Sequence, residues 1–371
     1  MRYLPLAAVL VASALLAACA GATGGPLATE VSVQATIFAP TETAFQPEPP
    51  TASPTELPGP EVTTSVLLGL DYDPNRPQRN EYGIRTDVFV IAALIIWPGP
   101  EYPPRLVLFS LPRDLYLPIA CAGEGGPDTW IELPGNTAID QPLADVPREA
   151  FDRINAAYYR GGPDCVRETV RWNFGLTVDG PVATVEMGRF VEAVDYLGGL
   201  DITPSKDYVD FCGYYLGTDG NGGDWRHWRD GVTRHLTGNE VLCYIRGRRT
   251  PEGDLDRNRR TLEVIEAARQ QWKPQELYDR TGVAGIADLF GWAAKYVRFD
   301  GLDVVPWLVE HFVDLQDAEV HTARLRLGES VGFWTTPGGA SVIVPAFELN
   351  EPGMDQADYL MHWFGCTLWS C

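Results

Sequence analysis

Three runs of apolar residues dominate the first part of the chain, and none of them alternates regularly with polar positions. They read VTTSVLLGLD at residues 62–71, DVFVIAALII at 87–96 and RLVLFSLPRD at 105–114, and each runs into a polar or proline-containing turn. Apolar runs of this length, rich in β-branched residues, are typical of strands that are covered on both faces. The pattern therefore predicts three strands of a buried sheet.

Helical patterns take over after residue 150. Several of these segments end in glycine, which is a common residue at the end of a helix. The spacing predicts helices at residues 151–162, 163–175, 187–199 and 255–272, a short helix that begins in LTGNEVLCYIRGR at 236–248, and a glycine-rich loop at 213–231. Because strands and helices are interspersed, we expect an α/β protein with α-β-α layers, in which helices flank a mixed central sheet.

The first residues have the character of a targeting signal. The stretch MRYLPLAAVLVASALLAACAG carries one arginine and then an apolar run that ends in small residues, as secretory signals do. Its last residues before Cys19 resemble the lipobox of bacterial lipoproteins. We therefore expect residues 1–19 to be a lipoprotein-type signal segment, with a lipid on Cys19 and cleavage of the chain just before it. A short uncleaved membrane anchor is the alternative. Both readings place the rest of the chain outside the cytoplasm and tied to a membrane.

Residues 20–60 are rich in proline and threonine and show no sustained periodicity. This composition is typical of a disordered tether, so we expect a single folded domain at 61–371. Beyond Cys19 the chain has an even number of cysteines, which in an exported protein indicates disulfides. Their order along the chain suggests the pairs Cys121 with Cys165, Cys212 with Cys243, and Cys366 with Cys371.

Charge narrows the range of partners. The 371 residues carry a formal net charge of −21, from 50 acidic and 29 basic side chains. Such a chain lacks a broad basic face for phosphate backbones, so we expect no nucleic-acid partner. Lysine occurs only three times, so almost all positive charge is arginine, which holds phosphate or carboxylate with a planar fork of donors.

One window gathers arginine against this acidic background. Residues 246–260 read RGRRTPEGDLDRNRR, with six arginines and three acidic residues. An extended backbone would put Arg246 and Arg248 on one face, and helical spacing would put Arg257, Arg260 and Thr261 on another. The window is either a solvated network of ion pairs, with Asp254 or Asp256 as a helix N-cap, or a pocket for a polyanion.

Charged residues at the strand ends favour the pocket. Asp71 follows the first apolar run, Arg85 and Asp87 open the second, and Arg113 closes the third. Arginines neutralise the oxygens of a pyrophosphate, and carboxylates hold Mg²⁺ or take a proton from an attacking hydroxyl. Competing catalytic patterns are missing from the sequence, which contains no HExxH, no GxSxG and no Walker A motif.

The chain resembles the LytR-CpsA-Psr family. The resemblance rests on VLLGLD, IRTD, FSLPRD, RINAAY, VDYLGGL, LTGNEVLCYIRGR and GDLDRNRR, in that order, between about residues 62 and 272, and residues 300–350 would complete the domain. It implies a membrane-anchored extracytoplasmic phosphotransferase. Such an enzyme uses Mg²⁺ (or Mn²⁺) to move a phosphorylated glycopolymer from a polyprenyl-pyrophosphate carrier to peptidoglycan or another cell-wall acceptor, with the lipid tail in an apolar tunnel.

The resemblance also implies roles for single residues. Asp71 and Asp87 match the paired aspartates near the metal and the catalytic base, and which of the two is the base stays open. The residues that match the family's arginine set and its acidic partner on the pyrophosphate are Arg85, Arg113, Arg246, Arg248, Asp254 and Arg257, with Arg260 extending it. The apolar runs at 88–96 and 105–111 would wall the lipid, or serve only as core strands.

Four features depart from the family pattern. Thr261 stands where the family carries glutamine, Arg153 stands where lysine is common, the anchor is a lipobox-like cysteine, and the other cysteines are unusual. Two alternatives therefore stay beside the transferase. One is a lipoprotein that binds the carrier without turnover, and the other is a pyrophosphatase that hydrolyses the carrier lipid without a sugar acceptor.

Overall fold

The computed structural model describes most of the region predicted to fold. It describes residues 59–72, 84–99, 101–121, 131–133, 145–212, 224–271, 291, 295, 297–300, 311–328 and 330–345. The signal sequence, the tether and three of the cysteines, Cys19, Cys366 and Cys371, lie outside these residues, and the predictions made for them stay predictions. The elements described below belong to one compact unit that begins at Pro60.

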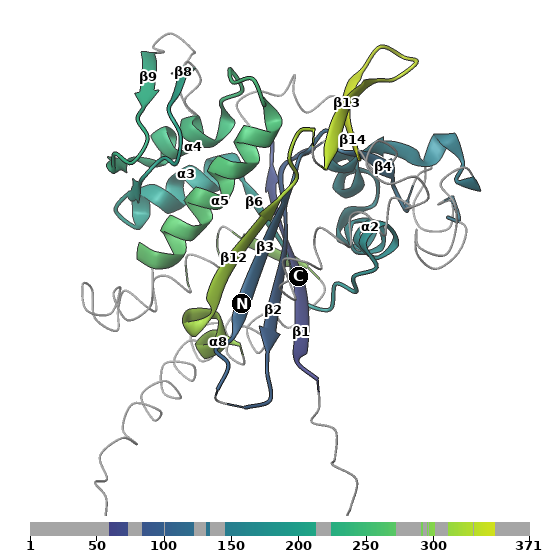
Figure 1. Cartoon of the computed structure of the whole chain (residues 1–371), viewed down its shortest axis with the longest axis horizontal. Helices are drawn as coiled ribbons and strands as arrows, with labels where there is room; N and C mark the ends of the chain where they lie inside the picture. Colours follow the sequence, from purple (N-terminus) through teal and green to yellow (C-terminus); the bar gives the residue numbers. More distant parts are fainter. Residues whose placement is uncertain are drawn as a thin grey trace, which may run out of the picture. The chain divides into compact units, whose positions relative to one another are not determined.

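A six-stranded mixed sheet forms the centre of this unit (Figure 1). The three predicted strands are confirmed as its middle, where β2 pairs antiparallel with both β1 and β3. On the two sides of these strands, β6 runs parallel to β1 and β12 runs parallel to β3, while β11 is antiparallel to β6. The strands are, in spatial order, β11 (Val297–Asp300), β6 (Val182–Glu186), β1 (Glu61–Leu70), β2 (Thr86–Ile96), β3 (Arg105–Leu111) and β12 (Glu319–Arg324).

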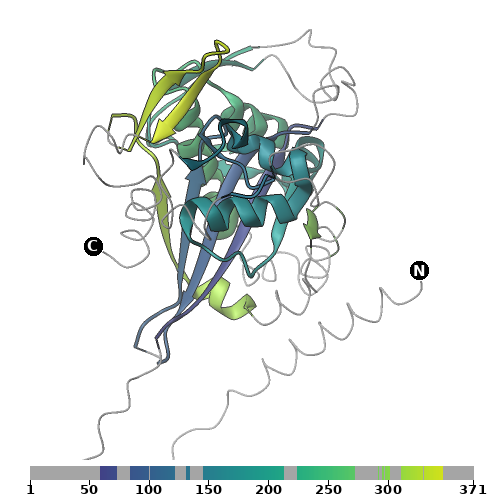
Figure 2. The ribbon, with the colours of Figure 1, turned by 90° about the vertical axis from the view of Figure 1, so that its right-hand side faces the viewer.

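Both faces of the sheet are covered, which explains why the strand sequences are apolar throughout. Successive side chains point to opposite faces, so Phe109 packs in the core shared with helix α2 (Ala157–Phe174), whereas Leu108 packs in the core shared with α5 (Asp254–Gln271). Figure 2 shows α2 lying across one face of the sheet. The short helix α8 (Phe312–Asp317) packs on the same face as α5. The α/β class with helices around a mixed sheet is thereby confirmed.

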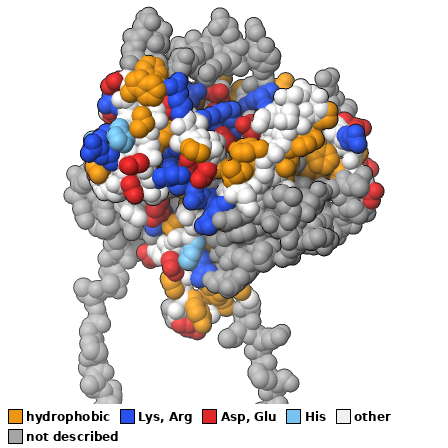
Figure 3. All heavy atoms as spheres, turned by 45° about the horizontal axis from the view of Figure 1, so that its top comes forward, with side chains coloured by type: hydrophobic (Ala, Val, Ile, Leu, Met, Phe, Trp, Pro, Cys, Tyr) orange, Lys and Arg blue, Asp and Glu red, His pale blue; other side chains and the backbone are white. Residues whose placement is uncertain are grey.

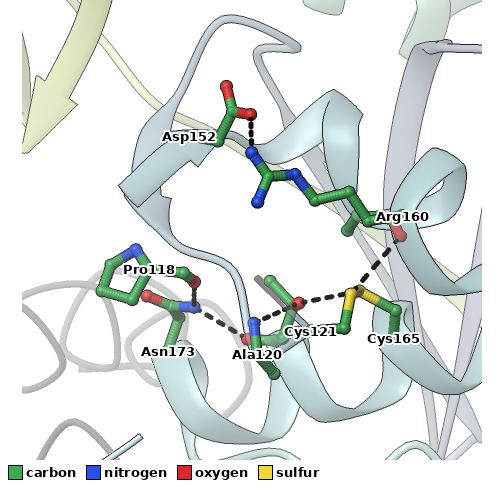
Figure 4. The surroundings of a disulfide bond; sticks show 9 residues. Pro118, Ala120, Cys121, Asp152, Arg160, Cys165 and Asn173 are labelled. Carbon is green, nitrogen blue, oxygen red and sulfur yellow. Dashed lines mark hydrogen bonds and ion pairs between the residues drawn. A yellow bond between two sulfur atoms is a disulfide. The ribbon is translucent and has the colours of Figure 1, made fainter. Parts of the chain in front are cut away.

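Helix α2 is tied to the strand β4 (Tyr116–Pro118) and the turn after it (Figure 4). The predicted disulfide between Cys121 and Cys165 is present, with its Cα atoms 5.5 Å apart. At the end of α2, the side-chain amide of Asn173 donates to the carbonyl oxygen of Pro118 at 2.8 Å. Disulfide and hydrogen bond together hold the segment after β3 against the helix that covers the sheet.

A second group of elements packs beside α5. Its apolar cluster joins α3 (Met187–Tyr196), α4 (Gly238–Arg246) and the inner side chains of two hairpins. Thr237 and Glu240 form a capping box that starts α4. The second predicted disulfide, Cys212 with Cys243, fastens one hairpin to this helix. The two hairpins are β7 (Leu200–Ile202) with β10 (Arg234–Leu236), and β8 (Tyr208–Cys212) with β9 (Asp224–Trp228).

The remaining short elements of the described part lie around β4. The hairpin of β13 (Val331–Thr335) and β14 (Ser341–Pro345) contacts β4, and β4 pairs with β5 (Phe151–Arg153). Two turns of 3₁₀ helix, Arg148–Ala150 and Ile154–Ala156, flank β5. None of the helices in the described ranges is both long enough and apolar enough to cross a lipid bilayer.

Three predicted boundaries are wrong. Residues 151–156 are β5 and a 3₁₀ turn rather than helix, because pairing with β4 competes successfully with local helix propensity. Residues 224–228 are the strand β9 rather than loop, since their aromatic side chains pair across to β8. Arg246 is the last residue of α4 rather than part of an extended run. The predicted break at Gly161 and Gly162 is confirmed as non-helical backbone inside α2.

Candidate functional site

Charged residues converge at one end of the central strands. β1 and β3 end there and β2 begins there, because β2 runs antiparallel to both neighbours. Asp71 follows β1 and donates its backbone N–H to the carbonyl oxygen of Arg85 at 2.9 Å. Asp87 is the second residue of β2, and Arg113 follows the end of β3. Topology alone therefore brings the strand-end residues of the sequence together.

The Asp87 carboxylate is the centre of the site. Arg113 Nη1 donates to Asp87 Oδ1 at 2.6 Å, while Arg257 Nη1 and Arg248 Nη2 lie 3.7 and 3.9 Å from Oδ2. Arg257 also donates to the backbone carbonyl oxygen of Asp87. Its side chain is only 3% exposed, so this guanidinium is a built-in part of the site rather than a surface group.

Asp254 is a second carboxylate in the same cluster. It is the first residue of α5, and its Oδ2 accepts the backbone N–H of Arg113 at 3.0 Å. Its Oδ1 lies 3.2 Å from Arg257 Nη2 and 3.9 Å from the Nε atoms of both Arg248 and Arg113. Asp254 therefore links the start of α5 to the end of β3 and fixes the spacing of the three arginines.

Two other predicted residues lie at the edge. Arg246 Nη2 is 3.9 Å from Asp71 Oδ1, so this pair extends the cluster along the end of β1. Arg85 is exposed, and its side chain takes part in none of the ion pairs between described residues. The structure thus brings together Asp71, Asp87, Arg113, Arg246, Arg248, Asp254 and Arg257.

Arg260 does not join this cluster. Its guanidinium is fully buried and lies over the ring of Tyr208, with 4.1 Å from Cζ to the ring centroid. It donates to the carbonyl oxygen of Gly247, between the two predicted arginines of the loop. The structure therefore gives Arg260 a place underneath the arginine loop and not beside Asp87.

The sequence reasoning missed the residues that hold this loop. Asp210, on the inner face of β8, accepts the backbone N–H of Arg248 at 3.1 Å and the hydroxyl of Tyr208 at 2.6 Å. Gly247 leaves no room for a side chain, since an added Cβ would overlap the Tyr208 hydroxyl. The signals available in the sequence were the aspartates and aromatic residues within 207–212 and the glycine inside RGR.

The arginines decide the charge state of Asp87. Burial raises the pKa of this carboxyl group, but the positive charges of Arg257, Arg113 and Arg248 outweigh burial and hold the pKa at about 2. Arg248 shows the reverse balance, because burial and repulsion from Arg257 and Arg113 lower its pKa. An added anion would relieve that repulsion. The Nε atoms of Arg113 and Arg257 are buried and make no hydrogen bond within the described part of the chain.

This pKa predicts how acid affects stability. Lowering the pKa of Asp87 from 3.8 to about 2 corresponds to about 2 kcal/mol of folding free energy, present above about pH 4 and lost as the pH falls towards 2. We expect Asp87→Asn to lower the urea midpoint at pH 6, and the difference from wild type to shrink between pH 4 and 2. The control is Asp201→Asn, whose exposed pair with His235 contributes little. A difference that stays constant down to pH 2.5 would contradict the assignment.

An apolar cavity opens beside the cluster. It lies between the sheet and helices α3, α4 and α5 and has a volume of about 710 Å³ when the solvent at its mouth is included. Asp87, Arg246 and Arg257 contribute to its lining, so charged groups stand at one part of an otherwise apolar wall. The apolar lining residues are Leu67, Leu68, Val88, Val185, Met187, Phe190, Leu242, Ile245, Val264 and Ile265.

The cavity walls differ from the predicted ones. Val88 is the only apolar residue of the run 88–96 in the lining, and residues 105–111 are not part of it. The side chains of β3 pack instead in the cores on the two faces of the sheet. Thr261 also lines the cavity, and its hydroxyl donates to the Arg257 carbonyl oxygen at 3.0 Å. This side chain is thus engaged by its own helix.

The donor set can hold a divalent cation only together with a ligand. Among the described residues, no three carboxylate, histidine or cysteine side chains cluster as a complete metal site. Mg²⁺ is usually bound through one or two carboxylates plus phosphate oxygens and water, so Asp71 and Asp87 suffice as the protein's share. In Figure 3, Lys and Arg side chains gather in the middle of this face, with hydrophobic side chains to either side.

Relatives of known sequence share parts of this region. Regulatory protein MsrR of Staphylococcus aureus is 32% identical over 130 residues, which are 34% of this chain and 36% of that protein. TagV of Bacillus subtilis, named polyisoprenyl-teichoic acid–peptidoglycan teichoic acid transferase, is 29% identical over 141 residues, 38% of this chain and 32% of that one. The alignments thus span about a third of the length of these curated relatives.

Solved structures share the fold. A crystal structure of TagV from Bacillus subtilis superposes with a TM-score of 0.51 at 19% identity, over 82% of this chain and 98% of that one. Protein gbs0355 from Streptococcus agalactiae gives a TM-score of 0.53 at 17% identity, over 77% and 82% of the two chains. The model of the LytR_cpsA_psr family matches residues 59–280, which is more than half of the chain. The chain belongs to the LytR-CpsA-Psr family.

Proposed function

We propose that this chain is an extracytoplasmic phosphotransferase, held at the membrane by a lipid on Cys19. Its donor is a glycopolymer linked to a polyprenyl pyrophosphate, and its acceptor is a hydroxyl group of peptidoglycan or another cell-wall polymer. The name of TagV describes a transfer of this kind for a relative. One observation carries the proposal, namely that Asp87, which is surrounded by three arginines, lines an apolar cavity.

The two halves of the site match the two halves of such a donor. A pyrophosphate diester carries about two negative charges and needs several converging donors, which arginines provide in bidentate geometry. A prenyl tail needs an apolar wall, which β1, β6 and α3 to α5 provide. The cavity and the arginine cluster share Asp87, Arg246 and Arg257, so one ligand can occupy both.

The proposed step exchanges one phosphorus–oxygen bond for another. The acceptor hydroxyl oxygen attacks the phosphorus that carries the polymer, and the bond from this phosphorus to the bridging oxygen breaks. Prenyl phosphate leaves with the bridging oxygen, and the hydroxyl proton passes to a carboxylate. The chemistry requires mainly alignment and charge stabilisation, which the arginines supply without moving.

The charged groups around Asp71 and Asp87 favour a different catalytic role for each aspartate. A carboxylate whose pKa is about 2 is a weak proton acceptor at neutral pH, so Asp87 serves best to hold the three arginines and a cation. Asp71 lies beside Arg246 at the end of β1 and is left as the proton acceptor. We assign the base to Asp71 on this ground.

Charge counting supports a role for Mg²⁺. Arg113, Arg246, Arg248 and Arg257 face Asp71, Asp87 and Asp254, which leaves one net positive charge, four minus three. A diester with about two negative charges would not be neutralised by that excess. When held at Asp87, Mg²⁺ would supply the missing charge at the phosphate oxygens.

The test follows release of prenyl phosphate from a prenyl-pyrophosphate-linked sugar. The full chain in detergent is incubated with Mg²⁺, then with EDTA, in the presence and absence of a peptidoglycan oligosaccharide. We expect Mg²⁺-dependent release together with an adduct that has the mass of acceptor plus sugar phosphate, and both products lost in Arg113→Ala and Arg248→Ala. Arg171→Ala is the control, because this arginine pairs with Glu168 on the surface of α2, away from the cluster.

Two other outcomes identify the alternatives. Carrier binding that both variants weaken, without release, would support the non-catalytic lipoprotein. That reading has one structural observation in its favour, since the hydroxyl of Thr261 is bonded to its own helix. Release without any adduct, even with acceptor present, would support a carrier-lipid pyrophosphatase. No binding and no release would leave the cluster a structural network of ion pairs.

A further inference from the structure

The outer face of the β8–β9 hairpin exposes a small aromatic surface. Phe211 and Trp225 lie opposite each other across the two strands, with ring centroids 5.7 Å apart at an interplanar angle of 62°. Trp225 is 58% exposed and Phe211 40% exposed, and Val209 beside them is exposed too. Large apolar side chains are usually not left in a contiguous exposed group, so this face is a candidate binding surface.

The hairpin holds this surface rigidly. Its inner side chains, Tyr208, Cys212 and Trp228, are buried in the core that α4 and α5 share. The disulfide between Cys212 and Cys243 fastens the end of β8 to α4. Because strand side chains alternate between faces, Phe211 and Trp225 must point away from this core. The aromatic pair is therefore presented to solvent on a fixed support.

Polar groups frame the aromatic pair. The Arg249 guanidinium lies over the Trp225 ring, with 5.1 Å from Cζ to the ring centroid, and its Nε is 3.5 Å from Asp210 Oδ1. His227 pairs with Val209 on the outer face. The outer face thus combines exposed aromatic side chains with a guanidinium donor and an imidazole beside them, while the buried Asp210 carboxylate orients Arg249 from below.

This combination matches a sugar ring. A pyranose has one face of C–H bonds, which packs on the electron-rich face of an aromatic ring, and hydroxyl groups that both donate and accept at its edge. The exposed parts of the two aromatic side chains amount to roughly 200 Å². A stable protein partner needs about 800 Å² on each side, so the surface is too small for one.

The position of the aromatic surface, next to the arginine cluster, indicates which sugar-bearing molecule it would bind. The carboxylate of Asp210 contacts both the backbone N–H of Arg248, in the arginine cluster, and the side chain of Arg249, beside the aromatic surface. The two sites are therefore adjacent. Neither aromatic residue lines the apolar cavity, and both are open to a ligand that arrives from solvent. The chain enters the sheet at Glu61, which is at the opposite end of β1 from Asp71.

We infer that Phe211, Trp225 and Arg249 bind a sugar ring of the acceptor glycan and bring its hydroxyl group to the arginine cluster. This inference rests on the proposed function for its acceptor, but its binding test does not need turnover. The probe is chitotetraose, a neutral glycan of N-acetylated pyranose rings, titrated calorimetrically into the full chain in detergent. We expect saturable binding that Trp225→Ala weakens at least tenfold and Phe211→Ala weakens less.

The matched control is Trp334→Ala. Trp334 is 44% exposed but lies on β13, in a different hairpin, so its removal should leave chitotetraose affinity unchanged. Binding of a prenyl pyrophosphate, measured in parallel, should be unchanged in Trp225→Ala. Oligosaccharide binding without prenyl-pyrophosphate binding would overturn the proposed function but would still support the aromatic surface as a sugar-binding site.

Three outcomes would contradict the inference that the aromatic surface binds a sugar ring. The first is no oligosaccharide binding by wild type, and the second is equal binding by wild type and Trp225→Ala. The third uses vesicles of phosphatidylglycerol and phosphatidylcholine. Sedimentation with vesicles that Trp225→Ala abolishes, without any oligosaccharide binding, would make this face a membrane contact, since tryptophan and arginine also favour the lipid interface.

Discussion

Replacing Arg257 by glutamine will remove most of the activity and a large part of the stability. This arginine is the only cation of the cluster that is almost completely buried among the described residues, and it contacts both Asp87 and Asp254. Loss of a positioned arginine costs phosphoryl-transfer enzymes about a thousandfold or more in rate. Removing one partner of a buried ion pair costs about 3–5 kcal/mol, because the remaining charge stays buried.

The measurement pairs a rate with an unfolding curve. Prenyl phosphate release and the urea midpoint are recorded for wild type, Arg257→Gln and Arg269→Gln. Arg269 is on the same helix, about three turns further on, and pairs with Glu266 at 3.0 Å on the surface. Because surface pairs contribute little, we expect Arg269→Gln to match wild type in both readouts. Equal unfolding curves for both variants would show that Arg257 is not a buried support of the site.

The half of the site at the strand ends could be predicted from sequence, for a topological reason. Apolar runs identify β1, β2 and β3, and three consecutive strands joined antiparallel bring the end of the first and third to the start of the second. Asp71, Asp87 and Arg113 therefore meet whatever the details of packing. The resemblance to the family added Arg248 and Asp254, whose contacts depend on α5 meeting the end of β3.

The other half depended on contacts between distant segments. Arg257 and Arg260 are three residues apart, and helical spacing cannot say which of them faces the sheet and which faces β8. In the structure, it is Arg260 that faces β8, where its guanidinium lies over the Tyr208 ring. The strand β5 was missed for the same kind of reason, since its pairing partner β4 is more than thirty residues away along the chain. Short local patterns carry no information on such pairings.

Gly247 shows how closely the arginine loop is packed. Its backbone, at φ −61° and ψ 145°, is open to any residue, so Gly247→Ala introduces no backbone strain. An added Cβ would overlap the Tyr208 hydroxyl and lie 2.5 Å from Asp210 Oδ2. Tyr208 is buried, bonded to Asp210 and covered by Arg260, so it cannot swing aside without releasing the loop.

We therefore expect Gly247→Ala to lower the free energy of unfolding by about 3 kcal/mol and to weaken prenyl-pyrophosphate binding at least tenfold. Gly188→Ala is the control, because nothing lies within 4 Å of its added Cβ and alanine favours the helix in which it stands. In a double-mutant cycle, Gly247→Ala should lower the free energy of unfolding much less in the Tyr208→Ala background than in wild type, because Tyr208→Ala removes the overlapping atoms. Strictly additive losses would mean that the glycine is needed for another reason. If binding falls in Gly247→Ala while Arg248→Ala binds normally, the loop acts through its backbone and not through its arginine.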